Sequence, residues 1–110
     1  MRFPKRGEVY WVNLDPVVGT EINKKRPAVI ISNDTGNEFS SRVIVAPITS
    51  QVSKMYPFDV AITVKNKIGR ALMDQIKAID KVRLGNLIDK LGLVALLEID
   101  TALKKVLALK

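Results

Sequence analysis

Apolar residues follow two different spacings along this chain of 110 residues. Residues 27–32 and 42–48 form nearly continuous apolar runs, which predict short strands buried on both faces. Residues 58–65 are apolar at every second position, so they predict an antiparallel strand with one exposed face. Residues 8–14 mix aromatic and β-branched side chains and also predict a strand, as does the segment 71–79, which has a polar break at Asp74 and Gln75. Short strands joined by turns indicate a small barrel or sandwich.

The end of the chain changes to a helical spacing. From Leu93 to Leu107, apolar residues recur at intervals of three and four, which predicts a C-terminal helix with Gly92 as its N-cap. This helix carries more leucine than one packing face needs, so it either packs deeply on the barrel or also forms a dimer interface. Residues 33–37 predict a turn, and a short helical turn is expected to begin at Asp80. The expected fold is mainly β with a C-terminal helix (α+β), in one domain over residues 1–110.

Composition narrows the possible chemistry. The chain contains no cysteine and no histidine, which excludes thiol chemistry, disulfides and every mechanism that needs an imidazole base. The formal net charge of +7 favours a polyanionic partner, nucleic acid first, although the same surplus also serves solubility alone. No segment has the length of a membrane span or the composition of a secretion signal, so we expect a cytoplasmic protein.

The acidic residues stand singly along the chain, and no phosphate-binding or dinucleotide-binding glycine motif is present. We therefore expect no metal site and no cofactor. Cleavage of RNA remains open to such a protein, because RNA carries its own nucleophile in the 2′-hydroxyl group. The protein then has to hold an in-line geometry and stabilise the charge that develops on the phosphate oxygens.

Three residues suit this reaction. Arg26 begins a buried strand and is a candidate phosphate clamp, because a guanidinium grips two phosphate oxygens at once. Thr49 ends the next apolar run and is a candidate hydroxyl donor, and Glu21 is a candidate base. Each has an ordinary structural alternative: a solvated cation at a strand end, a turn-forming hydroxyl and an exposed loop acid. If the two apolar strands pair, Arg26 and Thr49 come to one edge of the sheet.

Several short motifs follow one another over nearly the whole chain. They are RGEVYWVNLDP at residues 6–16, GTE at 19–21, RPAVIISND at 26–34, VAPITS at 45–50, YPF at 56–58, ALMDQIK at 71–77, and DK and RL within 80–84. In this order the chain resembles the MazF/PemK family of toxin endoribonucleases. The resemblance implies a compact SH3-like β barrel that forms a homodimer and cuts single-stranded mRNA at short sequence motifs without a metal. It also implies inhibition of translation and growth, and neutralisation by a cognate antitoxin.

The resemblance assigns roles to individual residues. Arg26 and Thr49 match the family's catalytic arginine and hydroxyl residue, and Glu21 matches an acidic position that assists in some members. Lysines are expected to hold phosphates, and loop hydroxyls and amides are expected to read unstacked bases. The residues expected to contact RNA are Lys5, Thr20, Lys24, Lys25, Ser50, Gln51, Lys54, Asp74, Gln75 and Lys77.

Two other functions are compatible with the sequence. The same barrel is used by toxins that bind DNA gyrase and have no nuclease activity. A non-catalytic RNA-binding module would also explain the positive charge. Incubation with purified RNA separates the three possibilities, because only a nuclease shortens the RNA.

Overall fold

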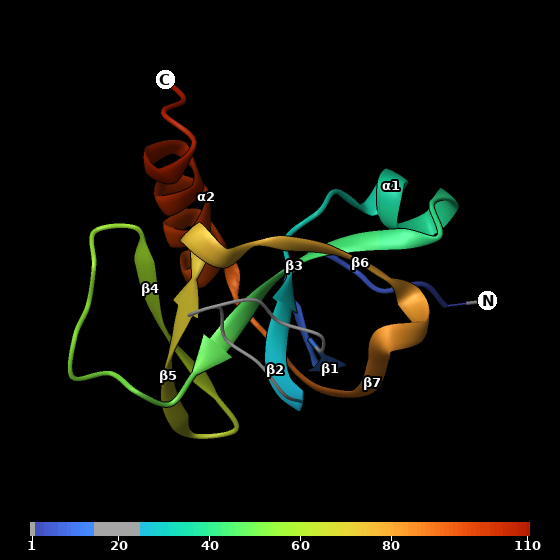
Figure 1. The fold of residues 1–110 in the computed structure, drawn as a ribbon, viewed down its shortest axis with the longest axis horizontal. Coiled ribbons are helices and arrows are strands. Elements are labelled where there is room, and N and C mark those ends of the chain that lie inside the picture. Colours follow the sequence, from blue (N-terminus) through green and yellow to red (C-terminus); the bar gives the residue numbers. More distant parts are fainter. Residues whose placement is uncertain (1, 15–24) are drawn as a thin grey trace.

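The computed structural model describes residues 2–14 and 25–110 (Figure 1). Short strands are the commonest elements of this part of the chain, and the longest helix stands at its C-terminal end. In chain order the elements are β1 (Glu8–Asn13), β2 (Lys25–Ile30), α1 (Asp34–Phe39), β3 (Arg42–Thr49), β4 (Asp59–Val64), β5 (Lys67–Leu72), the 3₁₀ helix η1 (Met73–Gln75), β6 (Lys77–Asp80), the 3₁₀ helix η2 (Lys81–Arg83), β7 (Leu84–Lys90) and α2 (Leu93–Val106).

The strands form one antiparallel sheet in the order β4–β5–β3–β2–β1–β7. Strand β3 is central: one of its edges pairs with β2, and its other edge carries β6 beside residues 42–45 and β5 beside residues 48–49. In Figure 1, β3 crosses the middle of the molecule and the strands curl around it as a half-barrel. The predicted mainly β, barrel-like fold with a C-terminal helix is confirmed.

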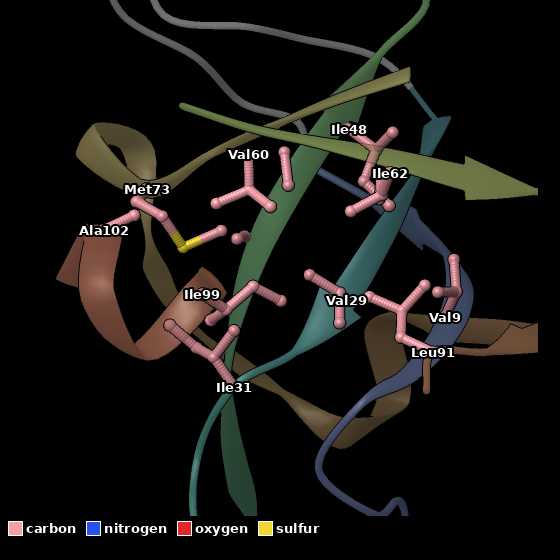
Figure 2. Packing of buried hydrophobic residues seen from close by; sticks show 12 residues of the cluster. Val9, Val29, Ile31, Ile48, Val60, Ile62, Met73, Leu91, Ile99 and Ala102 are labelled. Atoms are coloured by element: carbon pink, nitrogen blue, oxygen red, sulfur yellow. The ribbon is translucent and has the colours of Figure 1, made fainter. Parts of the chain in front are cut away.

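The continuous apolar runs are buried on both faces over most of their length, as their sequence predicts, and Ile44 of β3 is an exception at 39% exposed. Val29 of β2 and Ile48 of β3 point into the larger core, which α2 covers with Ile99 and Ala102 (Figure 2). Full burial of a side chain such as Ile99 contributes roughly 1.5–3 kcal/mol, so the inner face of α2 fixes this helix to the sheet. The smaller core lies on the other face of the same strands and consists of Val12, Leu14, Ala28, Ile30, Val43, Val45 and Ile79.

The turn predicted for residues 33–37 is wrong, because this segment starts helix α1. Asn33 is the N-cap, and its side-chain oxygen accepts a hydrogen bond from the amide of Gly36 at 2.7 Å. Asn37 is fully buried and donates to the backbone carbonyl of Ser32 at 2.9 Å. Asparagine and aspartate favour both turns and N-caps, so the local sequence does not separate the two. The burial of Asn37 against the segment that follows β2 favours the helix.

Three other expectations concern the second half of the chain. The C-terminal helix is confirmed with Gly92 as its N-cap, and the helical turn at Asp80 is confirmed as η2. The polar break expected at Asp74 and Gln75 within the strand segment 71–79 is confirmed: this pair belongs to η1, which separates the end of β5 from β6. Strand β7 was not predicted. Among the residues described, no helix is long and apolar enough to cross a lipid bilayer.

Candidate functional site

The sheet brings the ends of β2 and β3 together. These strands pair antiparallel, with Ala28 opposite Pro47. Continuing this register by two residues places Arg26 opposite Thr49, because antiparallel partners advance in opposite directions. The observed pairs of β2 and β3 end at Ala28 and Pro47, so Arg26 and Thr49 lie just beyond them, and both line the cavity at this end of the sheet. The arginine and the hydroxyl residue are therefore neighbours on the sheet.

Two neighbouring strands extend this pair into a row of four residues. Val12 of β1 is the partner of Arg26, and Arg70 of β5 is the partner of Thr49. The row lies on the side of the sheet that carries the smaller core, which we call the Arg26 face. Val12 is 1% exposed and Thr49 is 8% exposed, whereas Arg26 is half-buried. A charge at this border of the core is screened less than a charge in bulk water.

The hydroxyl group of Thr49 is oriented by the loop that follows β3. Its oxygen accepts a hydrogen bond from the backbone amide of Gln51 at 3.2 Å. A hydroxyl has one proton and two lone pairs, so this bond uses a lone pair and leaves the proton to be donated to another group. A phosphate oxygen beside Arg26 is a suitable acceptor.

The mouth of the half-barrel is a cavity of about 550 Å³, which we call the mouth cavity. It is lined by residues from β1, β2, β3, β7 and the β4–β5 hairpin. The cations in its lining are Lys25, Arg26, Lys65 and Lys67, and the hydroxyl residues are Thr49 and Ser50. Its apolar lining consists of Trp11, Pro27, Ile48, Val64, Ile68 and Ile88. Within the part of the chain that the structure describes, the cavity lining contains no acidic residue.

The β4–β5 hairpin holds its lysines in place. Lys65 and Asn66 have φ values of 49° and 66°, as in the tight two-residue turns that suit twisted hairpins. The carboxylate of Asp89 in β7 accepts hydrogen bonds from the backbone amides of Lys65, at 2.9 Å, and Lys90, at 2.8 Å. These two backbone hydrogen bonds lower the pKa of Asp89 below its usual value. The tip of the hairpin is thereby fixed to β7 beside the cavity.

Five of the residues expected at the site lie together. Lys25, Arg26, Thr49 and Ser50 line the mouth cavity, and Gln51 is bonded to Thr49.

The residues expected near β6 lie further away. Lys77 shares the Arg26 face, because its partner Val45 points into the smaller core. It is nevertheless displaced from Thr49 by four residues of β3, or about 13 Å at 3.3 Å per residue. Asp74 is exposed and Gln75 is half-buried in η1, between β5 and β6. A strand of RNA that crosses the Arg26 face would have to run along β3 to reach all of them.

Two lysines are not brought to the mouth cavity. Lys54 lies in the loop after β3, where its carbonyl accepts a hydrogen bond from the guanidinium of Arg70. Lys5 lies at the opposite end of β2, because the amide of the nearby Gly7 donates to the carbonyl of Ile30 at 2.8 Å. The predicted site residues Thr20, Glu21 and Lys24 lie outside the described residues.

Sequence reasoning missed four residues of this region. Trp11, Lys65 and Lys67 line the mouth cavity, and Arg70 stands beside Thr49. Two lysines around an asparagine, directly after an alternating strand, were a usable signal for a basic hairpin tip. Nothing in the local sequence shows that Arg70 forms an ion pair with Asp59, at 3.4 Å.

Over residues 2–14 and 25–110, no group of three or more acidic side chains is arranged to hold a metal ion.

Comparisons with known proteins agree with this architecture. The model of a family described as PemK-like, MazF-like toxin of type II toxin-antitoxin system matches residues 5–107. Endoribonuclease EndoA of Bacillus subtilis is 43% identical over 110 residues, which cover 96% of this chain and 95% of that protein. Endoribonuclease MazF9 of Mycobacterium tuberculosis is 39% identical over 109 residues, which cover 91% of this chain and 92% of that protein.

Solved structures share the fold. MazF of Deinococcus radiodurans superimposes with a TM-score of 0.87 at 25% identity, covering 99% of this chain and all of that one. A mycobacterial endoribonuclease in complex with its cognate antitoxin superimposes with a TM-score of 0.80 at 26% identity, covering 100% of this chain and 98% of that one. Because the family model spans most of the chain and both relatives exceed 30% identity over nearly their full lengths, this chain belongs to the family of PemK-like, MazF-like toxins of type II toxin–antitoxin systems.

Proposed function

We propose that this protein is an endoribonuclease toxin that cleaves single-stranded RNA without a metal ion and is neutralised by an antitoxin. The endoribonucleases EndoA and MazF9, at 43% and 39% identity, support the activity. The observation that carries the mechanism is the register of β2 and β3, which makes Arg26 and Thr49 neighbours at a cation-lined cavity.

In the proposed reaction, the 2′-hydroxyl oxygen attacks the adjacent phosphorus and the bond from phosphorus to the 5′ oxygen breaks. The products are a 2′,3′-cyclic phosphate and a 5′-hydroxyl, the latter protonated from solvent. Arg26 stabilises the charge that develops on the phosphate oxygens, and the hydroxyl of Thr49 donates a hydrogen bond to one of them. Arginine side chains keep their proton at neutral pH, so Arg26 acts electrostatically rather than as an acid. Glu21 is the proposed acceptor of the 2′ proton.

Binding of the RNA on either side of the cut is assigned to cations and loop side chains. Lys25 at the mouth cavity and Lys77 further along the Arg26 face are both exposed and able to hold phosphates. Each phosphate contact should add about 0.7 to the slope of log affinity against log salt concentration for a single strand. A binding constant that does not change with salt would contradict this assignment.

The decisive experiment incubates the purified protein with single-stranded RNA in EDTA and analyses the ends of the fragments. We expect cutting to persist and to leave cyclic phosphate ends. Arg26→Ala should abolish cutting. Arg42→Ala removes the same charge at the other end of β3 from Thr49, and this variant should cut normally.

Three outcomes would contradict the proposal. Loss of cutting in EDTA that magnesium restores would refute the metal-free mechanism. RNA that is bound but left intact would indicate a non-catalytic binding module. Neither binding nor cutting would favour a toxin that acts on another target, such as DNA gyrase.

A homodimer and an acidic antitoxin segment complete the proposal. The outer face of α2 exposes Leu93, Val94 and Leu97, at 72%, 71% and 55%, which supports an interface with a second copy. A mouth lined by cations supports binding of an acidic segment. Sedimentation equilibrium should give twice the mass of one chain for the wild type and a smaller mass for Leu97→Glu.

A further inference from the structure

The loop between β3 and β4 begins directly after Thr49, the proposed hydrogen-bond donor of the cleavage reaction. Near the start of the loop, the backbone amide of Gln51 donates to the hydroxyl oxygen of Thr49 at 3.2 Å. Further along, the carbonyl of Lys54 accepts a hydrogen bond from the guanidinium of Arg70 in β5. The position of the loop, and with it the bond that orients Thr49, therefore depends on a side chain of another strand.

Asp59 fixes both Arg70 and the far end of the loop. Arg70 is the partner of Thr49 in β3 on one side and of Ala61 in β4 on the other. Asp59 stands two residues before Ala61, so its side chain lies on the same face of the sheet as Arg70. Its carboxylate lies 3.4 Å from the guanidinium and accepts the backbone amide of Tyr56 at 2.9 Å. The ion pair thus holds the loop at two points.

Stability alone does not explain this ion pair. The side chains of Arg70 and Asp59 are 13% and 1% exposed, so both charges have lost most of their hydration. The Nε atom of Arg70 and one oxygen of Asp59 are also buried without a hydrogen-bond partner among the described residues, which costs further free energy. Two apolar side chains often replace such a pair without loss of stability. Apolar side chains could not, however, donate to the loop carbonyl or accept the loop amide.

The orientation of the Thr49 hydroxyl matters for the proposed reaction. Rotation about the Cα–Cβ bond moves the hydroxyl of a threonine among three staggered positions. The bond from Gln51 favours one of them and occupies a lone pair, which leaves the proton to be donated to a phosphate oxygen. A displaced loop removes this bond, and a displacement of a catalytic group by about 1 Å can slow a reaction by about 100-fold.

We propose that Arg70 is a positioning residue for RNA cleavage: it fixes the loop after β3 so that the amide of Gln51 keeps the hydroxyl of Thr49 directed at the scissile phosphate. This inference rests on the proposed endoribonuclease activity and deepens it. In this role Arg70 contacts neither the RNA nor the reacting atoms, and it acts through the loop.

The first test measures the rate of a single round of cleavage at saturating enzyme, with a single-stranded RNA that the wild type cuts. Arg70→Met should lower this rate about 10- to 100-fold and leave the enzyme concentration for half-maximal rate unchanged, because binding of the RNA does not involve Arg70. Arg70→Lys should recover most of the rate, since the Nη1 atom of Arg70 makes both contacts and one ammonium group can make them as well. Arg42→Met removes an arginine from the start of β3 and is the matched control, which should cut at the wild-type rate.

The second test separates positioning from stability. The double variant Arg70→Met with Asp59→Leu should regain the stability that Arg70→Met loses, because no buried carboxylate is left without its counter-ion. This variant still lacks the bonds to the loop, so its cleavage rate should stay as low as that of Arg70→Met. Recovery of the rate together with the stability would overturn the positioning role.

The third test follows the loop directly by amide hydrogen exchange in NMR. The amide of Gln51 should exchange faster in Arg70→Met and in the double variant than in the wild type, because it loses its acceptor. The amide of Lys65, which donates to Asp89 at 2.9 Å, is the internal control and should exchange at the wild-type rate in every variant. Slower cleavage without a change at Gln51 would show that Arg70 does not act through this loop, and would overturn the proposal.

A direct contact between Arg70 and the RNA predicts a different result. Each phosphate contact that is lost lowers the slope of log affinity against log salt concentration by about 0.7. An RNA with a 2′-deoxyribose at the scissile nucleotide binds without being cut, and its slope should be the same for the wild type and Arg70→Met. A fall of about 0.7 would make Arg70 a phosphate-binding residue and overturn the positioning role.

The results distinguish this inference from the proposed function. If the wild type cuts RNA and Arg70→Met cuts it equally fast, the positioning role is wrong and the proposed function stands. If the wild type does not cut RNA, the proposed function itself fails, whatever the exchange rate of the Gln51 amide.

Discussion

The ion pair between Arg70 and Asp59 gives a quantitative test of how the loop after Thr49 is held. The Asp59 carboxylate is 1% exposed and the Arg70 side chain is 13% exposed, with 3.4 Å between their charged atoms. Asp59 also accepts the backbone amide of Tyr56 at 2.9 Å, and Arg70 donates to the carbonyl of Lys54. The pair therefore ties two points of the loop between β3 and β4 to the sheet next to Thr49.

The size of the expected stability loss follows from the burial of the two charges. Arg70→Met leaves Asp59 as a buried carboxylate without its counter-ion, which should lower the free energy of unfolding by about 3–5 kcal/mol. The double variant Arg70→Met with Asp59→Leu should recover most of this loss, because replacing a buried ion pair by apolar residues is often neutral or stabilising. One oxygen of Asp59 and the Nε of Arg70 are buried without a hydrogen-bond partner among the described residues, which lowers the net value of the native pair.

The assay is a double-mutant cycle by urea denaturation, with the wild type, both single variants and the double variant. Equal m-values would show that the variants unfold to similar denatured states. A loss below about 1 kcal/mol for Arg70→Met would contradict the argument, since that value is typical of an exposed ion pair. A double variant less stable than either single variant would contradict it as well.

Three further predictions concern other parts of the fold. Gly69→Ala should lower stability by about 1–3 kcal/mol and slow RNA cleavage, because the added β carbon would lie 3.1 Å from the backbone oxygen of Thr49; equal unfolding midpoints would contradict it. Asn37→Leu should cost about 1–3 kcal/mol in urea denaturation, because it leaves the polar groups of Ser32 without their buried partner. Burial raises the pKa of Tyr10 to about 12, so its contribution to stability should be complete below pH 10 and be lost as the pH rises towards 12. Ultraviolet titration, with Tyr10→Phe as the reference, measures this pKa, and a midpoint near 10 for Tyr10 would contradict the prediction.

The spacing of apolar residues correctly predicted those elements whose own side chains show which of their faces are buried. The continuous run at residues 42–48 predicted a strand buried on both faces, and β3 has that environment because it lies at the centre of the sheet. The spacing of three and four predicted α2. Such patterns work because side chains point to fixed sides of a strand or helix, whatever the rest of the chain does.

Elements that depend on a distant partner were not readable in the same way. Strand β7 contains Gly85 and Asn86, which have little tendency to form strands, and its pairing with β1 is interrupted by two register shifts. It forms a strand because the backbone groups on the edge of β1 need hydrogen-bond partners, and β1 lies far from β7 in the sequence.

The candidate site likewise combines features that the local sequence shows with features that only the fold creates. The sequence by itself determined that Arg26 begins one buried strand and that Thr49 ends another, because both positions border apolar runs. Only the tertiary structure decided that β2 and β3 pair in the register that makes them neighbours, that Arg70 stands on the other side of Thr49, and that a lysine-tipped hairpin reaches the same mouth. Strand register and hairpin position follow from the packing of both cores together, so no short stretch of sequence contains them.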